Sequence, residues 1–198
     1  MFVGDEGGVV LIAGGRGTGK TTLAKRLVGE DALRNGGVVV NAVEAERPDY
    51  EAVAVVETEW GAATVTKLSR LMRRQHAART RRPVACVFDD CMDGPGWQRN
   101  ATVRTLLERA RALKVRVVFI YDAVPKLSPF VRERLDVVFL AGDTNVERVR
   151  RAYEACGREA GFPSLDAFGI ACSRMVARPF EFMDLKGVLP EETMPSDE

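Results

Sequence analysis

The feature that most constrains this chain is a glycine-rich octapeptide near its amino end, Gly-Gly-Arg-Gly-Thr-Gly-Lys-Thr at Gly14 to Thr21. An apolar run, Val9 to Ala13, precedes it, and apolar residues at helical spacing follow it over Lys20 to Val28. A strand, a glycine-rich loop of this spacing and a helix, in that order, form the phosphate-binding P-loop, or Walker A motif. The sequence therefore predicts a P-loop fold.

The residue types of this loop suit a nucleotide with magnesium. Glycines let backbone N–H groups approach a highly charged phosphate, and the following helix directs its positive end at the same anion. Lys20 is predicted to reach the β and γ phosphates, and Thr21 to ligate Mg²⁺ through its hydroxyl. We expect the Lys20 side chain to be exposed in the empty loop. The residues predicted to bind ATP are Gly14, Gly15, Arg16, Gly17, Thr18, Gly19, Lys20, Thr21 and Thr22.

A second motif is the apolar run Val84 to Phe88, which ends in two carboxylates, Asp89 and Asp90. A buried strand that ends in an acid is a Walker B pattern. Asp89 is predicted to hold magnesium through its water shell, and Asp90 to orient and activate the attacking water, the step at which a hydrolase differs from a kinase. The alternative for Asp90 is a cap of the following turn. The two motifs together predict an ATPase.

Short Val-rich runs alternate with longer amphipathic segments along the chain. This alternation predicts a mostly parallel sheet with helices on both faces, a three-layer α/β sandwich. The length of 198 residues suits one ATPase domain over residues 1–185, and the prolines and acids of residues 186–198 predict a flexible tail. We expect about five strands, at residues 9–13, 38–42, 84–88, 115–121 and 137–140, and helices at 20–28, 64–78, 100–113 and 146–160.

Composition limits the partners. The formal net charge is only +1, so DNA binding needs local evidence. Six arginines crowd the segment Arg70 to Arg82, which predicts either a DNA contact or a solvated helix face. No apolar run approaches the ~20 residues of a membrane span, so no membrane partner is expected. The four cysteines lack CxxC spacing, and neither disulfides nor zinc are predicted.

The order of the motifs resembles the RecA-like (ASCE) branch of P-loop ATPases, which includes AAA proteins, helicases and DNA pumps. A strand and a helix are expected between the two Walker motifs, and Asp90 directly follows the Walker B aspartate. An added strand and a second acid are typical of that branch.

Three later segments make the resemblance more specific: Glu108 to Val115, Val117 to Asp122 and Leu127 to Phe139. With the Walker motifs they resemble the genome-packaging ATPases of nucleocytoplasmic large DNA viruses, poxvirus-like members of the FtsK/HerA superfamily. The likeness extends from about Gly8 to about Phe182. It implies a DNA-stimulated ATPase that forms a homo-oligomeric ring and pumps double-stranded DNA into a capsid, with capsid components as further partners. It also implies a location in the host cytoplasm, the viral factory or the virion.

The resemblance implies catalytic roles for three arginines outside the Walker motifs. Arg132 falls on the family's arginine after a Pro-Pro segment, and Arg134 replaces the family's asparagine. Either is a candidate for an arginine finger that acts on the neighbouring subunit. Arg111 falls on the family's Gly-Arg position, between alanines that replace Gly and His, and is the alternative finger. The other interpretation of Arg132 and Arg134 is a pair of exposed helix residues.

Asp122 departs from the family pattern, which has a γ-phosphate-sensing glutamine at the end of this strand. An anionic side chain there would repel phosphate unless a cation or proton intervenes. Asp122 is therefore either a sensor that works through water or magnesium, or the sign of slow or lost hydrolysis. Beside the packaging motor, the sequence leaves open a P-loop nucleotide or small-molecule kinase and a nucleotide-binding scaffold with reduced hydrolysis.

Overall fold

Within the residues that the computed structural model describes, 6–41, 50, 55–92, 96–176 and 181–185, seven strands form one sheet in the order β3-β2-β4-β5-β1-β6-β7. Every neighbouring pair is parallel except β6 with β7. The predicted α/β architecture with a mostly parallel sheet is confirmed. The strands are β1 (Gly8–Ala13), β2 (Val38–Asn41), β3 (Val55–Glu57), β4 (Val84–Asp89), β5 (Val115–Tyr121), β6 (Val137–Ala141) and β7 (Phe182–Asp184).

The expected number of about five strands was too small. All five expected strands form, and the two that the sequence did not indicate, β3 and β7, lie at the two edges of the sheet. Each has only three residues, so neither produces an apolar run long enough for a periodicity argument. The expected tail at residues 186–198 lies outside the described residues.

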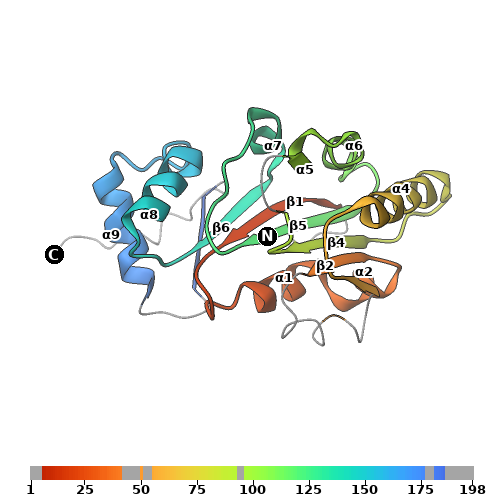
Figure 1. Ribbon diagram of the computed structural model, residues 1–198, viewed down its shortest axis with the longest axis horizontal. Coiled ribbons are helices and arrows are strands. Elements are labelled where there is room, and N and C mark those ends of the chain that lie inside the picture. The colour runs from red at the N-terminus through yellow and green to blue at the C-terminus, as the bar shows by residue number, and fades with distance from the viewer. Residues whose placement is uncertain (1–5, 42–49, 51–54, 93–95, 177–180, 186–198) are drawn as a thin grey trace.

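Helices cover both faces of the sheet and complete the three layers (Figure 1). One face carries α1 and α2, and the other carries α4 to α7; α8 and α9 pack at the β6 end. None of the helices in the described ranges is long and apolar enough to cross a membrane. The helices are α1 (Lys20–Val28), α2 (Glu30–Arg34), α4 (Ala62–Ala77), α5 (Gly96–Arg99), α6 (Ala101–Arg109), α7 (Pro129–Arg134), α8 (Val146–Ala152), which continues as a π-helical turn (Tyr153–Gly157), and α9 (Leu165–Val176).

The central strand β1 shows why the sequence reads as a continuous apolar run. Alternate side chains of a strand point to opposite faces, and both faces of this strand are covered. Val9 and Leu11 pack into the core beneath α4 and α6, whereas Val10 and Ile12 pack into the core beneath α1 and α2. All six residues of β1 are buried.

The strand order determines where the polar segments meet. β5 lies between β1 and β4, with Ala13 of β1 beside Tyr121 and Asp89 of β4 beside Ile120. Because these strands are parallel, the segments that follow them emerge at one edge of the sheet, which we call the carboxyl edge. The glycine-rich loop, Asp90 and Asp122 therefore lie at this edge. The added strand that the resemblance to the ATPase branch implied, between the two Walker motifs in sequence, is β2 (Val38–Asn41).

Candidate phosphate-binding site

The glycine-rich loop is fixed to both neighbours of β1. The Gly14 N–H donates to the Tyr121 carbonyl of β5 at 3.1 Å. A Cβ at Gly14 would lie 2.4 Å from the Cβ of Ala141 in β6, so a larger residue does not fit between the strands. Gly17 and Gly19 have φ angles of 78° and 90°, in the left-handed region where glycine is unstrained. Glycine is thus required for the loop's shape as well as for close approach of a ligand.

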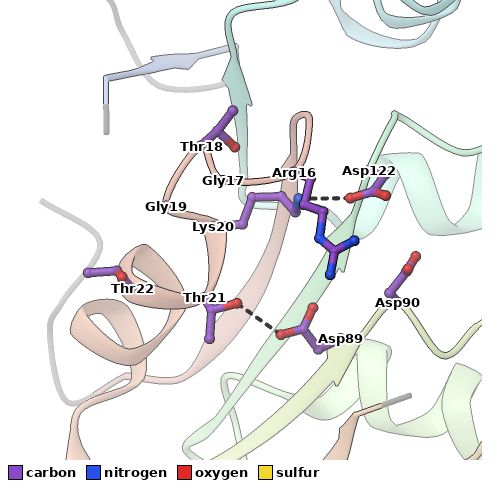
Figure 2. A pocket seen from close by; sticks show the side chains of 10 residues that line it. All are labelled: Arg16, Gly17, Thr18, Gly19, Lys20, Thr21, Thr22, Asp89, Asp90 and Asp122. Carbon is purple, nitrogen blue, oxygen red and sulfur yellow. Dashed lines mark hydrogen bonds and ion pairs between the residues drawn. The ribbon is translucent and has the colours of Figure 1, made fainter. Parts of the chain in front are cut away.

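The Lys20 side chain is turned inward, toward the loop and the end of β5. Its ammonium donates to the carbonyls of Gly14 at 2.7 Å and Gly15 at 3.0 Å, and to Asp122 Oδ1 at 2.9 Å (Figure 2). The side chain is only 12% exposed. The expectation that this lysine is exposed in the empty loop was wrong, because the loop's own carbonyls and Asp122 bind the amine.

Thr21 and Asp89 lie beside each other at the start of α1 and the end of β4. The Thr21 hydroxyl donates to Asp89 Oδ2 at 3.3 Å, and the Tyr50 hydroxyl donates to the same oxygen at 3.4 Å. Asp89 is 2% exposed. Carboxylate and hydroxyl oxygens are hard ligands of the kind that Mg²⁺ prefers, so these two residues have the chemistry of the predicted magnesium site.

Tyr50 is the residue of this site that sequence reasoning missed. It is fully buried and belongs to no motif, and it stands 39 residues before its partner Asp89. No local pattern connects the two residues, so only the folded chain reveals the contact.

Asp90 has an unusual backbone conformation. Its φ angle is 47°, which few residues other than glycine adopt and which asparagine and aspartate tolerate best. The Asp90 N–H donates to the Ile120 carbonyl at 3.0 Å, which holds the turn against β5. Backbone outliers of this kind cluster at functional sites. Figure 2 shows the Asp90 carboxylate beyond that of Asp89, across the cavity from the loop.

These residues enclose a cavity of about 390 Å³. Two cations, Arg16 and Lys20, line the cavity together with Asp122, which contacts Lys20, and the carboxylates of Asp89 and Asp90 lie across from the loop (Figure 2). A cationic, N–H-rich side suits phosphates, and a carboxylate side suits a cation or a polarised water. The full lining is Arg16, Gly17, Thr18, Gly19, Lys20, Thr21, Thr22, Asp89, Asp90 and Asp122.

Cysteine chemistry does not contribute to the site. Burial raises the pKa of the Cys86 thiol to about 12. Burial, with the nearby charges of Asp89 and Asp90, raises the pKa of the Cys91 thiol to about 12 as well. A raised thiol pKa favours the neutral form, so neither residue is a thiolate nucleophile near neutral pH. All four cysteines have free thiols.

The structure does not bring Arg111 to the cavity. Arg111 forms an ion pair with Asp136, whose Oδ2 accepts from the Val9 N–H at 2.7 Å. Val9 is near the amino end of β1, whereas the glycine-rich loop follows the carboxyl end of the same strand. Arg111 therefore lies at the opposite edge of the sheet, the amino edge. Asp136 thus links β1 to Arg111 there.

Arg132 and Arg134 also lie at the amino edge, on α7 immediately before β6. The Arg134 guanidinium stacks 3.7 Å from the ring centre of Phe130, and Arg104 stacks on the same ring at 3.6 Å. Arg134 also donates to the Phe130 carbonyl at 3.1 Å. None of the three candidate finger arginines faces the cavity of its own chain.

A glycine-rich loop after β1, a buried carboxylate beside its threonine and the cavity between them define the class of P-loop nucleotide-binding proteins. The chain belongs to the zeta toxin family, whose model matches residues 6–162. That family has a P-loop kinase-like fold.

A viral relative also matches the sequence. Uncharacterized protein 015R of Frog virus 3 (isolate Goorha) is 30% identical over 158 residues, which is 75% of this chain and 48% of that protein. The chain thus spans about half the length of the curated relative that it matches.

Viral packaging proteins share the fold. The DNA-packaging ATPase B204 of Sulfolobus turreted icosahedral virus superposes with a TM-score of 0.61 and 12% identity, over 94% of this chain and 100% of that one. The genome packaging NTPase B204 of Sulfolobus turreted icosahedral virus 2, in complex with ATP-gammaS, gives a TM-score of 0.55 and 14% identity, over 93% and 99%. The resemblance to viral packaging ATPases is confirmed at the level of the fold.

Proposed function

We propose that this protein is an ATPase that moves double-stranded DNA, and that it packages viral DNA into a capsid. The observation that carries the hydrolase assignment is Asp90, a second carboxylate directly after the buried Asp89 and across the cavity from Lys20. Its left-handed backbone supports a functional role, because such strain is retained where function requires it. The likeness to B204, a DNA-packaging ATPase, supports the DNA-moving part of the proposal.

The loop, Arg16, Lys20, Thr21, Asp89 and Asp90 each have a place in this reaction. The loop N–H groups and Lys20 would bind the phosphates of ATP, and Arg16 would add positive charge at their exposed side. Thr21 and Asp89 would hold Mg²⁺, which when bound offsets negative charge on the phosphate oxygens. Asp90 would orient a water for attack on the γ-phosphate and accept its proton.

The zeta toxin family match favours a second candidate, a kinase that transfers the γ-phosphate to a nucleotide or small molecule. The two candidates differ in the acceptor, which is water in one and a substrate hydroxyl in the other. Asp90, placed at the cavity where it can activate a water, supports the ATPase over the kinase.

ATP turnover with and without double-stranded DNA tests the proposal. We expect release of inorganic phosphate that rises when DNA is added. Phosphate that appears on a small acceptor, and only when the acceptor is present, would instead establish the kinase. Tight nucleotide binding without turnover under either condition would leave a nucleotide-binding scaffold.

The arginine segment 70–82 is the proposed DNA contact, and only part of it is available. Arg74 donates to the carbonyls of Asn35 and Gly36, and Arg81 to the carbonyl of Gln75, so these two guanidiniums stabilise the fold. Arg73, although exposed, donates to the Ser69 carbonyl at 3.4 Å, which leaves the exposed set Arg70, Arg79 and Arg82. We therefore place the phosphate contacts on this exposed set.

Changing the exposed set, Arg70, Arg79 and Arg82, to alanine is expected to weaken DNA binding for every sequence, because phosphates carry no base information. With each phosphate contact that is lost, binding releases fewer counterions from the DNA. The slope of log K against log salt should therefore flatten by about 0.9 per contact. Fluorescence anisotropy with a labelled duplex, over a series of salt concentrations, measures both effects.

The matched control removes three exposed arginines from the α8 end of the molecule, Arg150, Arg151 and Arg158. The same loss of net charge there should leave the salt slope unchanged. Equal slopes for both variants would show that the arginine segment is a solvated helix face and does not contact DNA.

Arg132 is the proposed arginine finger, and we propose that it acts on the cavity of another subunit. It lies at the amino edge, away from its own cavity, and falls on the arginine of the packaging ATPases that it resembles. The Arg132→Ala variant should bind ATP normally and hydrolyse it poorly, because the charge is needed in the transition state. Mixing it with the Lys20→Ala variant should restore part of the phosphate release, since mixed rings contain some complete interfaces.

Two results would contradict the assignment in trans. One is a mixture as inactive as its parts although the subunits exchange, and the other is full turnover by a monomer. The Arg134→Ala variant is the comparison: it should lower the urea midpoint, because the ring of Phe130 loses a packing partner.

A further inference from the structure

All three hydrogen-bond donors of the Lys20 amine have acceptors within the protein. An ammonium group has three N–H donors, and each of them has an acceptor here. The acceptors are the carbonyls of Gly14 and Gly15 and the carboxylate of Asp122, at 2.7, 3.0 and 2.9 Å. A phosphate oxygen can gain a bond from this amine only when one of the three acceptors gives way.

The two carbonyls are poor candidates to give way, because they belong to a fixed backbone. The Gly14 N–H is bonded to Tyr121 in β5, and the Gly15 carbonyl also accepts from the Thr18 hydroxyl at 2.9 Å. The Asp122 side chain is instead 58% exposed and can rotate toward solvent. Asp122 is therefore the acceptor that an incoming phosphate replaces.

Replacement does not remove the negative charge from the site. Asp122 is the first residue after β5 and lines the same cavity as the loop. Its carboxylate would stay near any phosphate bound to Lys20, and like charges that face each other oppose binding. Asp122 thus weakens the binding of such a ligand in two ways. The ligand must break the ion pair between Lys20 and Asp122, and it is repelled by the carboxylate.

We propose that Asp122 determines which phosphate ligands the loop accepts, by competing for Lys20 with β and γ phosphates. The proposal rests on the nucleotide site of the proposed function and assigns a selectivity to it. A P-loop lysine reaches the β and γ phosphates, so ATP and ADP must displace Asp122. AMP carries only the α phosphate and does not reach Lys20. Asp122 therefore lowers the affinity for ATP and ADP but not the affinity for AMP. The difference between these affinities becomes smaller.

The Asp122→Asn variant tests this competition, because asparagine keeps the length and an acceptor oxygen and loses the charge. Affinities for ATP-gammaS, ADP and AMP are measured by calorimetry at constant Mg²⁺. ATP-gammaS and ADP should bind more tightly by about fivefold, the effect of one exposed ion pair. AMP should bind the variant and the parent equally. The Asp122→Glu variant keeps the charge and should not gain this affinity.

An exposed acid outside the cavity provides the control. Asp166 lies in the first turn of α9, and Asp166→Asn makes the same change of charge there. It should leave all three affinities unchanged. An equal gain in this variant would attribute the effect to net charge and overturn the proposal.

Stability without ligand separates competition from a structural role. The Asp122→Asn protein should unfold at the same or a slightly lower urea concentration than the parent, because Lys20 loses an ion pair. With saturating ATP-gammaS it should gain more stability than the parent, since tighter binding stabilises the folded state more. If Asp122 had a purely structural role, its replacement would lower the urea midpoint without ligand and also the stability gained with ATP-gammaS.

The outcomes also distinguish this proposal from the proposed function. If the parent binds ATP-gammaS and Asp122→Asn binds it equally or more weakly, the selectivity proposal fails and the nucleotide site stands. A gain in AMP affinity as large as the gain for ATP-gammaS would also overturn it, because the effect of Asp122 would then not depend on competition for Lys20. If neither protein binds ATP-gammaS, the proposed function fails, and the selectivity proposal fails with it.

Discussion

The Lys20→Ala variant is expected to lose measurable ATP binding and turnover. Lys20 is a cation of the cavity with 12% of its side chain exposed, and its amine lies among the loop carbonyls where the phosphates would bind. Without it, the β and γ phosphates would meet the carboxylates of the site with less compensating charge. Calorimetry with ATP-gammaS measures the binding, and a phosphate-release assay measures the turnover.

The structure adds a second expectation for Lys20→Ala. The amine now binds the Gly14 and Gly15 carbonyls and Asp122, so its loss should also lower the free energy of unfolding by about 1 kcal/mol. Urea unfolding of both proteins checks that the variant is still folded under the assay conditions. Lys126→Ala, which removes an exposed lysine, is the control and should retain binding. Turnover of Lys20→Ala at the parental rate would show that the P-loop assignment is wrong.

The Asp90→Asn variant should bind ATP like the parent and hydrolyse it more slowly by about 10²- to 10⁴-fold, the usual effect of a lost general base. Asparagine is the appropriate replacement for a structural reason. The position has a φ angle of 47°, and asparagine tolerates this region as aspartate does. The change therefore removes the charge and leaves the turn after β4 in place.

Asp89→Asn is the matched comparison for Asp90→Asn. Asp89 is buried beside Thr21 and is the proposed magnesium ligand, so its replacement should weaken Mg²⁺-dependent nucleotide binding as well as turnover. Binding and chemistry should thus separate at Asp90 and fall together at Asp89. If binding and turnover fall together at Asp90 too, Asp90 holds the metal or the fold. If turnover is unchanged there, another group activates the water.

Local sequence was sufficient for the elements that are complete within a short stretch of chain. The loop between β1 and α1 needs glycine at Gly17 and Gly19, because their φ angles lie in the left-handed region, and this requirement comes from the backbone of the loop itself. The five longer strands are buried on both faces or nearly so. A strand buried on both faces needs apolar residues at successive positions, so it appears in the sequence as an unbroken apolar run. Asp89 and Asp90 could be located because they directly end such a run.

The tertiary structure alone decided which distant groups meet. Lys20 and Asp122 are 102 residues apart, and Tyr50 and Asp89 are 39 apart, so no periodicity relates them. Asp122 faces Lys20 because β1 and β5 are parallel neighbours in register, and their ends emerge at the same edge.

The same strand direction placed the three candidate finger arginines at the amino edge, away from their own cavity. Arg111 is held there by Asp136, and Arg132 and Arg134 are held there by the short α7 before β6. The sequence determined which residues can carry the chemistry. The direction and order of the strands, set by packing of the helices on both faces, decided which of these residues share one cavity. A side-chain contact across parallel strands depends on their register, and the local sequence pattern does not contain that register.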